Sequence, residues 1–290
     1  MAKPIAKWAG GKRQLVEQLL RLAPPDAFQE GPTYHEPMLG GGALFFCTEP
    51  RKAILSDLNP DLIFMYEMVR DRPAAVIEHL NRLRAEHHKD EKETYYAVRE
   101  EYNAGSMGER RAAQFLYLNK TCFNGLYRVN KKGHFNVPLG SYKNPSIYNS
   151  ADLINASILL RRAQLYRESF ENSAGRANSG DFVYFDPPYV PVSKTSDFTA
   201  FTAKGFGEND QRQLARTVEG LVERGVRVMV SNSDHPFVHG LYKDYPRTRV
   251  WARRSINSKA TGRGHVSELV VLAGYDPPNG TDLVTEKDYL

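Results

Sequence analysis

Short apolar runs rich in β-branched and aromatic residues recur along the chain, and polar residues, glycine or proline follow each run. Runs of this length and composition predict buried strands, whereas apolar residues spaced by three or four positions predict helices. Helical spacing marks residues 13–20, 158–165 and 208–224. The alternation predicts an α/β fold whose last two strands form an antiparallel pair. The predicted strands are residues 34–36, 53–56, 166–170, 181–185, 226–230, 249–255 and 268–274.

The stretch from residue 60 to residue 118 has helical spacing and no strong strand, so it predicts a helical insertion. Residues 119–130 and 134–138 then flank Lys131-Lys132-Gly133, which is typical of a β-hairpin with a basic tip. A segment rich in Ser, Asn, Tyr and Pro follows and predicts a linker back to the sheet. The expected organisation is a sheet domain in two parts, residues 1–58 and 151–290, with an insertion at residues 59–150 and its linker at residues 141–151.

The segment Asp186-Pro187-Pro188-Tyr189 follows the predicted strand 181–185 directly. Neither proline can donate a backbone hydrogen bond, so the chain leaves the sheet here as a stiff loop. Ligands of open α/β sheets bind at this carboxyl end of the strands. A carboxylate, a free carbonyl and an aromatic face suit the exocyclic amino group of a planar base. Taken alone, the same tetrapeptide is equally well explained as a turn.

Two further stretches predict ligand contacts near strand ends. Ala9-Gly10-Gly11-Lys12 at a helix start offers backbone N–H groups and one cation to an anion, either a carboxylate or a phosphate. It is not a nucleotide P-loop, because the first glycine and the Ser or Thr of that motif are missing. Asp57 follows a strand about twenty residues after the Gly40–Gly42 turn, the place of a ribose-binding acid. Without G-x-G-x-x-G, one adenosine-containing ligand is favoured over a nicotinamide cofactor.

The charge distribution predicts a polyanionic partner. The 290 residues carry a net charge of +5, and 41% of them are hydrophobic, as in ordinary globular proteins. The stretches 110–151 and 245–267 contain many Lys and Arg residues and no Asp or Glu, and aromatic residues are interleaved with them. Either stretch alone would be explained as a solvated face, but two together favour nucleic acid.

Other broad classes are disfavoured. No apolar run reaches the roughly 20 residues needed to cross a membrane, and the first residues lack the apolar core of a signal peptide. Cys47 and Cys122 have no close partner in sequence, so we expect no disulfide, no metal site and a cytoplasmic location.

Seven pieces of the chain, in the same order, make it resemble a known family, the Dam-type DNA adenine-N6 methyltransferases (D12 class, alpha group). The pieces are Lys7-Trp-Ala-Gly-Gly-Lys12, Glu36-Pro37 with Gly40-Gly-Gly42, Asp57-Leu-Asn59, Asn124-Gly-Leu-Tyr-Arg128, Phe135-Asn-Val-Pro138, Asp186-Pro-Pro-Tyr189 and Ser231-Asn232.

The resemblance implies a mixed seven-stranded methyltransferase sheet, S-adenosylmethionine as cofactor, and an inserted target-recognition domain of helices and a hairpin. It implies that the Asp186-to-Tyr189 loop holds a flipped adenine and carries the catalysis. The implied cofactor contacts are Trp8, Ala9, Gly10, Lys12 near the cofactor's carboxylate, Glu36, Pro37, Gly40, Gly42, Asp57 at the ribose, Ser169 and Phe170 at the adenine, and Asp186.

Double-stranded DNA, usually with the site GATC, is the implied substrate. The implied DNA contacts are Lys7, Phe123, Asn124, Leu126, Arg128, Asn130, Lys131, Lys132 and Pro138. Met38, Phe123 and Ser141 depart from residues common in the family, and Ser141 replaces a basic residue, so a phosphate contact is in doubt there.

Several alternatives stay open at this point. The same chemistry serves cytosine N4, RNA adenine or a glutamine amide. A catalytically silent DNA-binding protein and a nucleotide-phosphate enzyme using Lys12 are the rivals from other classes. A monomer or weak dimer is expected, with a cognate restriction endonuclease as one conceivable partner.

Overall fold

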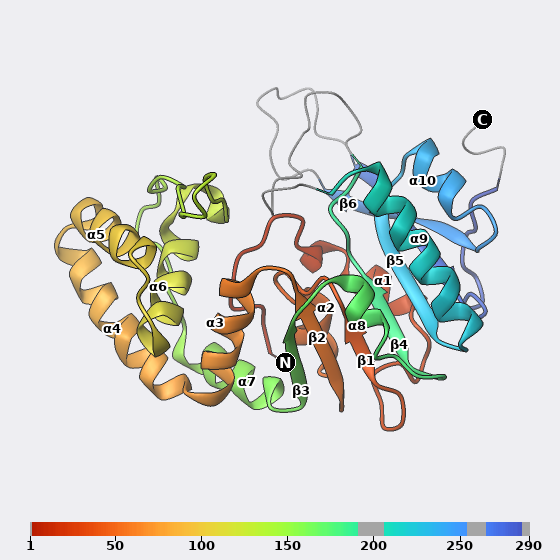
Figure 1. Ribbon diagram of the computed structural model, residues 1–290, viewed down its shortest axis with the longest axis horizontal. Coiled ribbons are helices and arrows are strands. Elements are labelled where there is room, and N and C mark those ends of the chain that lie inside the picture. Colours follow the sequence, from red (N-terminus) through yellow and green to blue (C-terminus); the bar gives the residue numbers. More distant parts are fainter. Residues whose placement is uncertain (1, 191–205, 254–264, 286–290) are drawn as a thin grey trace.

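A twisted seven-stranded sheet forms the centre of the computed structural model, which describes residues 2–190, 206–253 and 265–285 (Figure 1). The strand order within these residues is β3-β2-β1-β4-β5-β7-β6. The first five strands of this order are parallel, and β7 is antiparallel to both β5 and β6. The mixed seven-stranded sheet expected from the sequence is therefore confirmed. The strands are β1 (Tyr34–Glu36), β2 (Ala53–Asp57), β3 (Ala163–Arg167), β4 (Phe182–Phe185), β5 (Arg227–Ser233), β6 (Arg247–Arg253) and β7 (His265–Ala273).

Both faces of the sheet are covered, which explains why its central strands are continuous apolar runs rather than alternating ones. In β4, Phe182 and Tyr184 belong to one buried cluster, whereas Val183 and Phe185 belong to the other. The second cluster packs against the helices α8, α9 and α10, and the first packs against α1 and α2. These helices are α1 (Val16–Leu22), α2 (Ala43–Thr48), α8 (Phe170–Ala174), α9 (Glu208–Glu223) and α10 (Pro236–Leu241), and a 3-10 turn, η1 (Lys12–Gln14), precedes α1.

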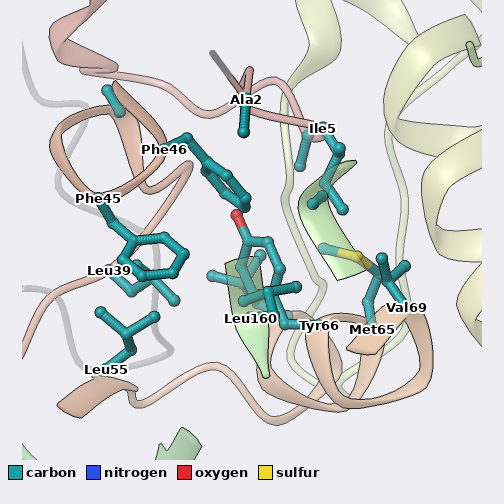
Figure 2. Packing of buried hydrophobic residues seen from close by; sticks show 14 of the residues in the cluster. Ala2, Ile5, Leu39, Phe45, Phe46, Leu55, Met65, Tyr66, Val69 and Leu160 are labelled. Atoms are coloured by element: carbon teal, nitrogen blue, oxygen red, sulfur yellow. The ribbon is translucent and has the colours of Figure 1, made fainter. Parts of the chain in front are cut away.

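The helices predicted between residues 60 and 118 are present and extend to one side of the sheet (Figure 1). Figure 2 shows how the first of them joins the sheet core: Met65, Tyr66 and Val69 lie beside Phe46 of α2 and Ile5 of the N-terminal segment. Asn59 begins this helix by accepting hydrogen bonds from two backbone N–H groups, and a proline occupies the first turn. The helices are α3 (Pro60–Asp71), α4 (Pro73–Lys89), α5 (Glu91–Asn103) and α6 (Gly108–Thr121).

The predicted hairpin exists only in part. Its first strand was expected from Asn119, but α6 continues to Thr121 because this end of the helix is buried against its neighbours. A 3-10 turn, η2 (Phe123–Gly125), follows. Two isolated antiparallel bridges close the segment around this turn. Cys122 pairs with Leu139, and Val129 pairs with Phe135. We call residues 122–140 the recognition arm.

Side chains of α5 replace the missing strand partners of the recognition arm. Tyr95 Oη donates to the Val137 carbonyl at 2.8 Å. The Asn103 amide pairs with both backbone groups of Phe135, at 3.0 and 2.8 Å. The arm therefore satisfies its backbone without a regular ladder.

The predicted helix 158–165 and strand 166–170 are wrong in position. Helix α7 (Ser150–Leu160) begins earlier, where Asn149 accepts a hydrogen bond from the Asp152 N–H, so the predicted linker is shorter. The strand begins at Ala163, because β2 offers it a parallel partner from Ala53 onward. Phe170 opens α8 instead of closing a strand.

The remaining expectations concern the second half of the chain. The amphipathic helix predicted for residues 208–224 is confirmed as α9, and the antiparallel pair as β6 and β7. Residues 254–264 of the basic stretch 245–267 lie outside the described residues.

Candidate functional site

Five parallel strands bring the predicted site residues to one edge of the sheet. Glu36 ends β1, Asp57 ends β2, Asp186 follows β4 and Ser233 ends β5. From β1 the strands β2 and β3 follow toward one side of the sheet, whereas β4 and β5 follow toward the other side. Ligands of such sheets bind at the switch point between β1 and β4. The glycine turn after β1 and the Asp186 loop therefore follow the two adjacent strands of this switch point.

The Asp186 loop leaves β4 with its carboxylate paired to Lys12. Lys12 Nζ lies 2.7 Å from Asp186 Oδ1 and also donates to the Gly10 carbonyl at 2.8 Å. Lys12 is only 5% exposed, and the Asp186 side chain is 21% exposed. Burial raises the pKa of Asp186 to about 6, although the Lys12 ammonium lowers it. At neutral pH Asp186 is thus a partly desolvated carboxylate and a strong hydrogen-bond acceptor.

Tyr189, at the end of the same loop, also contacts Lys12. The ammonium lies 4.5 Å from the centre of the Tyr189 ring, and the Tyr189 hydroxyl donates to Glu268 Oε2 of β7. Glu268 was not singled out in the sequence, although it is the one acid in an apolar strand. That contrast is the signal that would have identified it.

A chain of amide groups holds the middle of the loop. Gln211 of α9 donates from Nε2 to the Pro188 carbonyl at 2.9 Å. Asn232 of β5 donates to Gln211 Oε1 at 2.9 Å, and its own oxygen accepts from the Ser233 N–H. Gln211 is 1% exposed, so its amide has little access to water. The motif comparison included Asn232 but missed Gln211, whose partners are about twenty residues away on either side.

The glycine turn after β1 is shaped to accept close neighbours. Gly40 and Gly42 have positive φ angles of 47° and 63°. A Cβ atom on Gly40 would lie 2.6 Å from the indole of Trp8, so only glycine allows this contact. Tyr66 donates to the Gly40 carbonyl at 3.0 Å, and Figure 2 shows its hydroxyl extending past Phe46. The predicted residues Trp8, Gly40 and Gly42 are thus brought together.

Asp57 reaches into the same turn. Its two oxygens accept hydrogen bonds from the Gly40 and Asn59 N–H groups, both at 2.9 Å. A carboxylate has about four acceptor sites, so this arrangement orients Asp57 and leaves capacity for a further donor. Burial raises the pKa of Asp57, and the two N–H groups oppose that shift.

Glu36 is the most buried acid of the edge, at 3% exposure. One of its oxygens accepts from the Tyr34 hydroxyl at 2.8 Å and from the Phe45 N–H at 3.2 Å. Burial raises its pKa to about 8, against the two hydrogen bonds, and the nearby Asp186 charge adds to the rise. Glu36 is therefore largely protonated at neutral pH.

The other predicted cofactor residues surround this centre. Ser169 caps α8, and the buried Phe170 packs edge-on against Phe185. The Pro37 carbonyl accepts from the Ser56 hydroxyl at 3.2 Å. Ala9 and Gly10 lie in the turn before η1, where Gly10 has a φ of 78°.

Lys7 joins the N-terminal segment to the recognition arm. Its backbone N–H donates to Asn119 at 2.7 Å, and its ammonium lies 4.3 Å from the Tyr142 ring centre. A Cβ atom on Gly125 would lie 2.4 Å from the Lys7 side chain. Trp8, the next residue, stacks on Tyr127 with ring centres 5.7 Å apart. The recognition arm and the glycine turn thus contact the same short N-terminal segment.

The predicted DNA residues of the arm fall into two groups. Asn130 is a turn residue, because its side-chain oxygen accepts from the Lys132 and His134 N–H groups at 2.9 and 3.1 Å. Leu126 is partly buried against the core. The others are exposed: Phe123, Asn124, Arg128, Lys131, Lys132 and Pro138. Phe123 is 48% exposed, which an ordinary core phenylalanine would not be.

Neither a metal-binding cluster nor a membrane-spanning helix is present in the described part of the chain. Residues 2–190, 206–253 and 265–285 contain no group of three or more His, Cys, Asp and Glu side chains arranged to hold a metal ion. Within the same residues, every helix is too short or too polar to cross a bilayer.

Comparison with known proteins gives a consistent result. The family described as D12 class N6 adenine-specific DNA methyltransferase matches residues 8–256. The Type II methyltransferase M.MjaIII of Methanocaldococcus jannaschii is 42% identical over 285 residues, 93% of this chain and 98% of its own. The DNA adenine methylase of Escherichia coli K12 is 39% identical over 266 residues, 92% of this chain and 93% of its own.

Likeness to solved structures is weak. A methyltransferase of Streptococcus mutans in complex with SAH superposes with a TM-score of 0.33 at 9% identity, over 94% of this chain and 99% of its own.

Proposed function

The chain belongs to the D12 class N6 adenine-specific DNA methyltransferases, and from this premise we propose that it methylates adenine within GATC sites of double-stranded DNA through the Asp186 loop. The enzyme transfers a methyl group from S-adenosylmethionine to adenine N6. The observation that carries the assignment of residues is the position of Asp186, across the sheet's switch point from the glycine turn.

The residues around this switch point fit S-adenosylmethionine, which supplies a methyl group on a cationic sulfur. Asp57 is pre-oriented as an acceptor for ribose hydroxyls, and Gly40 allows close approach of the backbone. Ser169 and Phe170 lie beyond the neighbouring strand end and would flank the adenine ring. Trp8, Ala9, Gly10, Lys12, Glu36, Pro37 and Gly42 complete the proposed cofactor contacts.

Asp186 and the loop carbonyls perform the proposed chemistry on the target base. The N6 lone pair of adenine is conjugated into the ring, so the amine is a poor nucleophile. Acceptance of its two N–H bonds by Asp186 and the Pro187 carbonyl favours a tetrahedral nitrogen with a more available lone pair. Tyr189 stacks on the base, and holding both reactants in contact supplies much of the rate.

A duplex hides N6, so the base must leave the stack at a cost of a few kcal/mol. Phe123 is exposed on the recognition arm, which supports a role in filling or bracing the gap. We propose that residues 59–150 form the target-recognition domain, inserted between catalytic parts at residues 1–58 and 151–290. Its proposed DNA contacts are Lys7, Phe123, Asn124, Leu126, Arg128, Asn130, Lys131, Lys132 and Pro138.

We further propose that the protein acts in the cytoplasm as a monomer or weak dimer. Two relatives carry Type II methyltransferase names, M.MjaIII and M1.LlaDCHI of Lactococcus lactis subsp. cremoris, the latter 40% identical over 275 residues, 93% of this chain and 94% of its own. These names support a cognate restriction endonuclease as partner, and co-purification with the product of a neighbouring gene would test it.

Single-molecule sequencing of DNA from cells expressing the protein tests the target. We expect N6-methyladenine in GATC, and its loss with Asp186→Ala at unchanged protein level. Methylation of another adenine context would overturn GATC alone, whereas methylation by Asp186→Ala at the wild-type rate would overturn the proposed mechanism.

A further inference from the structure

Glu268 reaches the candidate site from a strand that the family motifs do not include. It lies opposite Ser233 of β5 and Val250 of β6. Because β7 is antiparallel to β5, residues near its beginning arrive at the edge where β5 and β4 end. Glu268 therefore stands beside the Asp186 loop, although 82 positions of sequence separate the two acids.

The Glu268 carboxylate is 18% exposed and has two partners from the site. One of its oxygens accepts the Tyr189 hydroxyl, and the same oxygen lies 4.0 Å from Lys12 Nζ. Lys12 lies 2.7 Å from Asp186 and over the face of the Tyr189 ring. The four side chains thus form a closed ring of contacts, in which the Asp186 and Glu268 carboxylates both lie near the Lys12 ammonium.

The contacts among these four side chains constrain groups that the proposed chemistry needs. The Tyr189 hydroxyl donates a hydrogen bond to Glu268, and the face of its ring contacts the Lys12 ammonium. These two contacts together orient the ring and fix its plane. The Glu268 carboxylate also lies near Lys12, but its distance of 4.0 Å from the ammonium is longer than the 2.7 Å of Asp186, so Lys12 stays paired mainly with Asp186.

We propose that Glu268 is a positioning residue for methyl transfer, which accepts the Tyr189 hydroxyl and thereby sets the plane of the Tyr189 ring for stacking of the target base. This inference rests on the proposed function, because it assumes that the base stacks on Tyr189. Glu268 acts through its neighbours and contacts no reacting atom in this arrangement.

Four variants separate a positioning role from a merely structural one. Glu268→Ala removes the acceptor, and Glu268→Gln keeps an oxygen for the Tyr189 hydroxyl but removes the charge. Tyr189→Phe removes the hydroxyl and keeps the ring. Glu219→Ala, on the exposed face of α9, is the matched control for loss of an acid.

Four measurements are made on the full-length protein. Single-turnover methylation of a duplex reports the chemical step. Fluorescence of a duplex with 2-aminopurine at the target position reports stacking of the flipped base. Calorimetric titration with S-adenosylmethionine and thermal unfolding report cofactor affinity and stability.

We expect Glu268→Ala to slow single turnover by about 10- to 100-fold, the range expected for small misplacement of reacting groups. Its 2-aminopurine signal should differ from the wild-type signal, while its cofactor affinity matches that of Glu219→Ala. Glu268→Gln should recover most of the rate. Its rate should also persist to lower pH, because the Glu268 charge contributes to the raised pKa of Asp186.

The combination with Tyr189→Phe decides the pathway. If Glu268 acts through the hydroxyl, Glu268→Ala with Tyr189→Phe is no slower than the slower single variant. Multiplied rate losses, or a wild-type rate for Glu268→Ala, would overturn the inference. Should Glu268→Ala unfold, a slow Tyr189→Phe beside a nearly wild-type Glu268→Gln supports it, and a wild-type rate for Tyr189→Phe overturns it. Wild-type protein that methylates no adenine would instead overturn the proposed function itself.

Discussion

At the scale of single residues, burial and neighbouring charges set the pKa values of the acids in the site. Asp186 is pulled in two directions, because burial raises its pKa to about 6 and the Lys12 ammonium opposes that rise. Glu36, which accepts hydrogen bonds from the Tyr34 hydroxyl and the Phe45 N–H, has its pKa raised to about 8 by burial. The two acids of one edge thus differ in protonation at neutral pH, which is common at functional sites.

The Asp186 pKa predicts an acid limb in the rate. Only the ionised carboxylate accepts both an amine N–H and the Lys12 ammonium, so protonation removes an acceptor. The single-turnover rate should fall tenfold per pH unit below about 6, where Asp186 becomes protonated. The measurement is a pH series at saturating cofactor and DNA, and a rate that stays flat down to about pH 5 would contradict the prediction.

The Glu36 pKa predicts a change in stability with pH. Between the ordinary value of 4.5 and about 8, the folded protein holds a proton that the unfolded chain has lost. Stability is therefore lost as the pH rises through this window. Glu36→Gln keeps the acceptor oxygen without the charge, so it should be more stable than wild type by roughly 1–3 kcal/mol at the upper end. Denaturant unfolding of cofactor-free protein checks this, and a difference independent of pH would refute it.

Gln211 predicts a positioning effect on the loop. Gln211→Leu leaves the Pro188 carbonyl and the Asn232 amide without their partner, at a cost of about 1–3 kcal/mol in stability. Because the carbonyl is part of the Asp186 loop, methyl transfer should also slow by about tenfold or more. Gln213→Leu, two residues along α9, is the control. Equal rates for the two variants would show that Gln211 does not position the loop.

At the scale of elements, the recognition arm explains how an irregular segment presents polar groups. Its backbone is satisfied by side chains of α5 rather than by a strand. This arrangement leaves the outer side chains exposed. Arg128 donates from Nε to Asn136 Oδ1 at 2.8 Å and from Nη2 to the Asn136 carbonyl at 3.5 Å, and a guanidinium has five donors in all.

Arg128 is therefore expected to read a base. Arginine contacts guanine O6 and N7 with two parallel bonds, worth about 1–3 kcal/mol of discrimination. Arg128→Ala should relax the choice of one base pair in the target with little change in salt dependence. Methylation rates on every single-base variant of the site test this, with Arg82→Ala of α4 as the control. A uniform slowing on all sites, with preference intact, would show that Arg128 only contacts the backbone.

At the scale of the whole molecule, one of the two basic stretches lies beside the sheet and not within it. The helical insertion and the arm extend from one side of the sheet, and they carry much of the basic stretch 110–151 (Figure 1). Trp8 stacked on Tyr127 connects this side to the glycine turn. Tyr127 also donates to Asp61 Oδ2 at 2.8 Å, and Asp61 pairs with Arg111. Packed side chains thus connect the recognition arm with the glycine turn.

Lys131 predicts the electrostatic part of DNA affinity. Phosphate contacts fix register without reading sequence, and each released counterion adds to the salt slope. Lys131→Ala should weaken binding to all sequences and lower the salt slope by about one. Titrations at several salt concentrations measure the slope, with the exposed Lys89→Ala of α4 as control. Loss of sequence preference in Lys131→Ala would contradict this division of labour with Arg128.

The apolar runs were sufficient to predict the central strands, because a strand buried on both faces must be continuous in hydrophobicity. The loop after β4 is also predictable from local sequence, because Asp186-Pro187-Pro188-Tyr189 cannot continue a strand or a helix. The order of the motifs along the chain is therefore sufficient to predict the fold, the chemistry and the position of Asp186 at the end of a strand.

Other features depend on partners that are distant in sequence. The end of α6 at Thr121 and the start of β3 at Ala163 follow from burial and from pairing with β2, which overrode the local signals. Gln211 and Glu268 became site residues only when α9 and the antiparallel β7 reached the Asp186 loop. The pairing of Lys12 with Asp186 across 174 positions of sequence belongs to the same class. Spacing along a chain reports local geometry, whereas these contacts depend on the sheet order that brings distant strand ends to one edge.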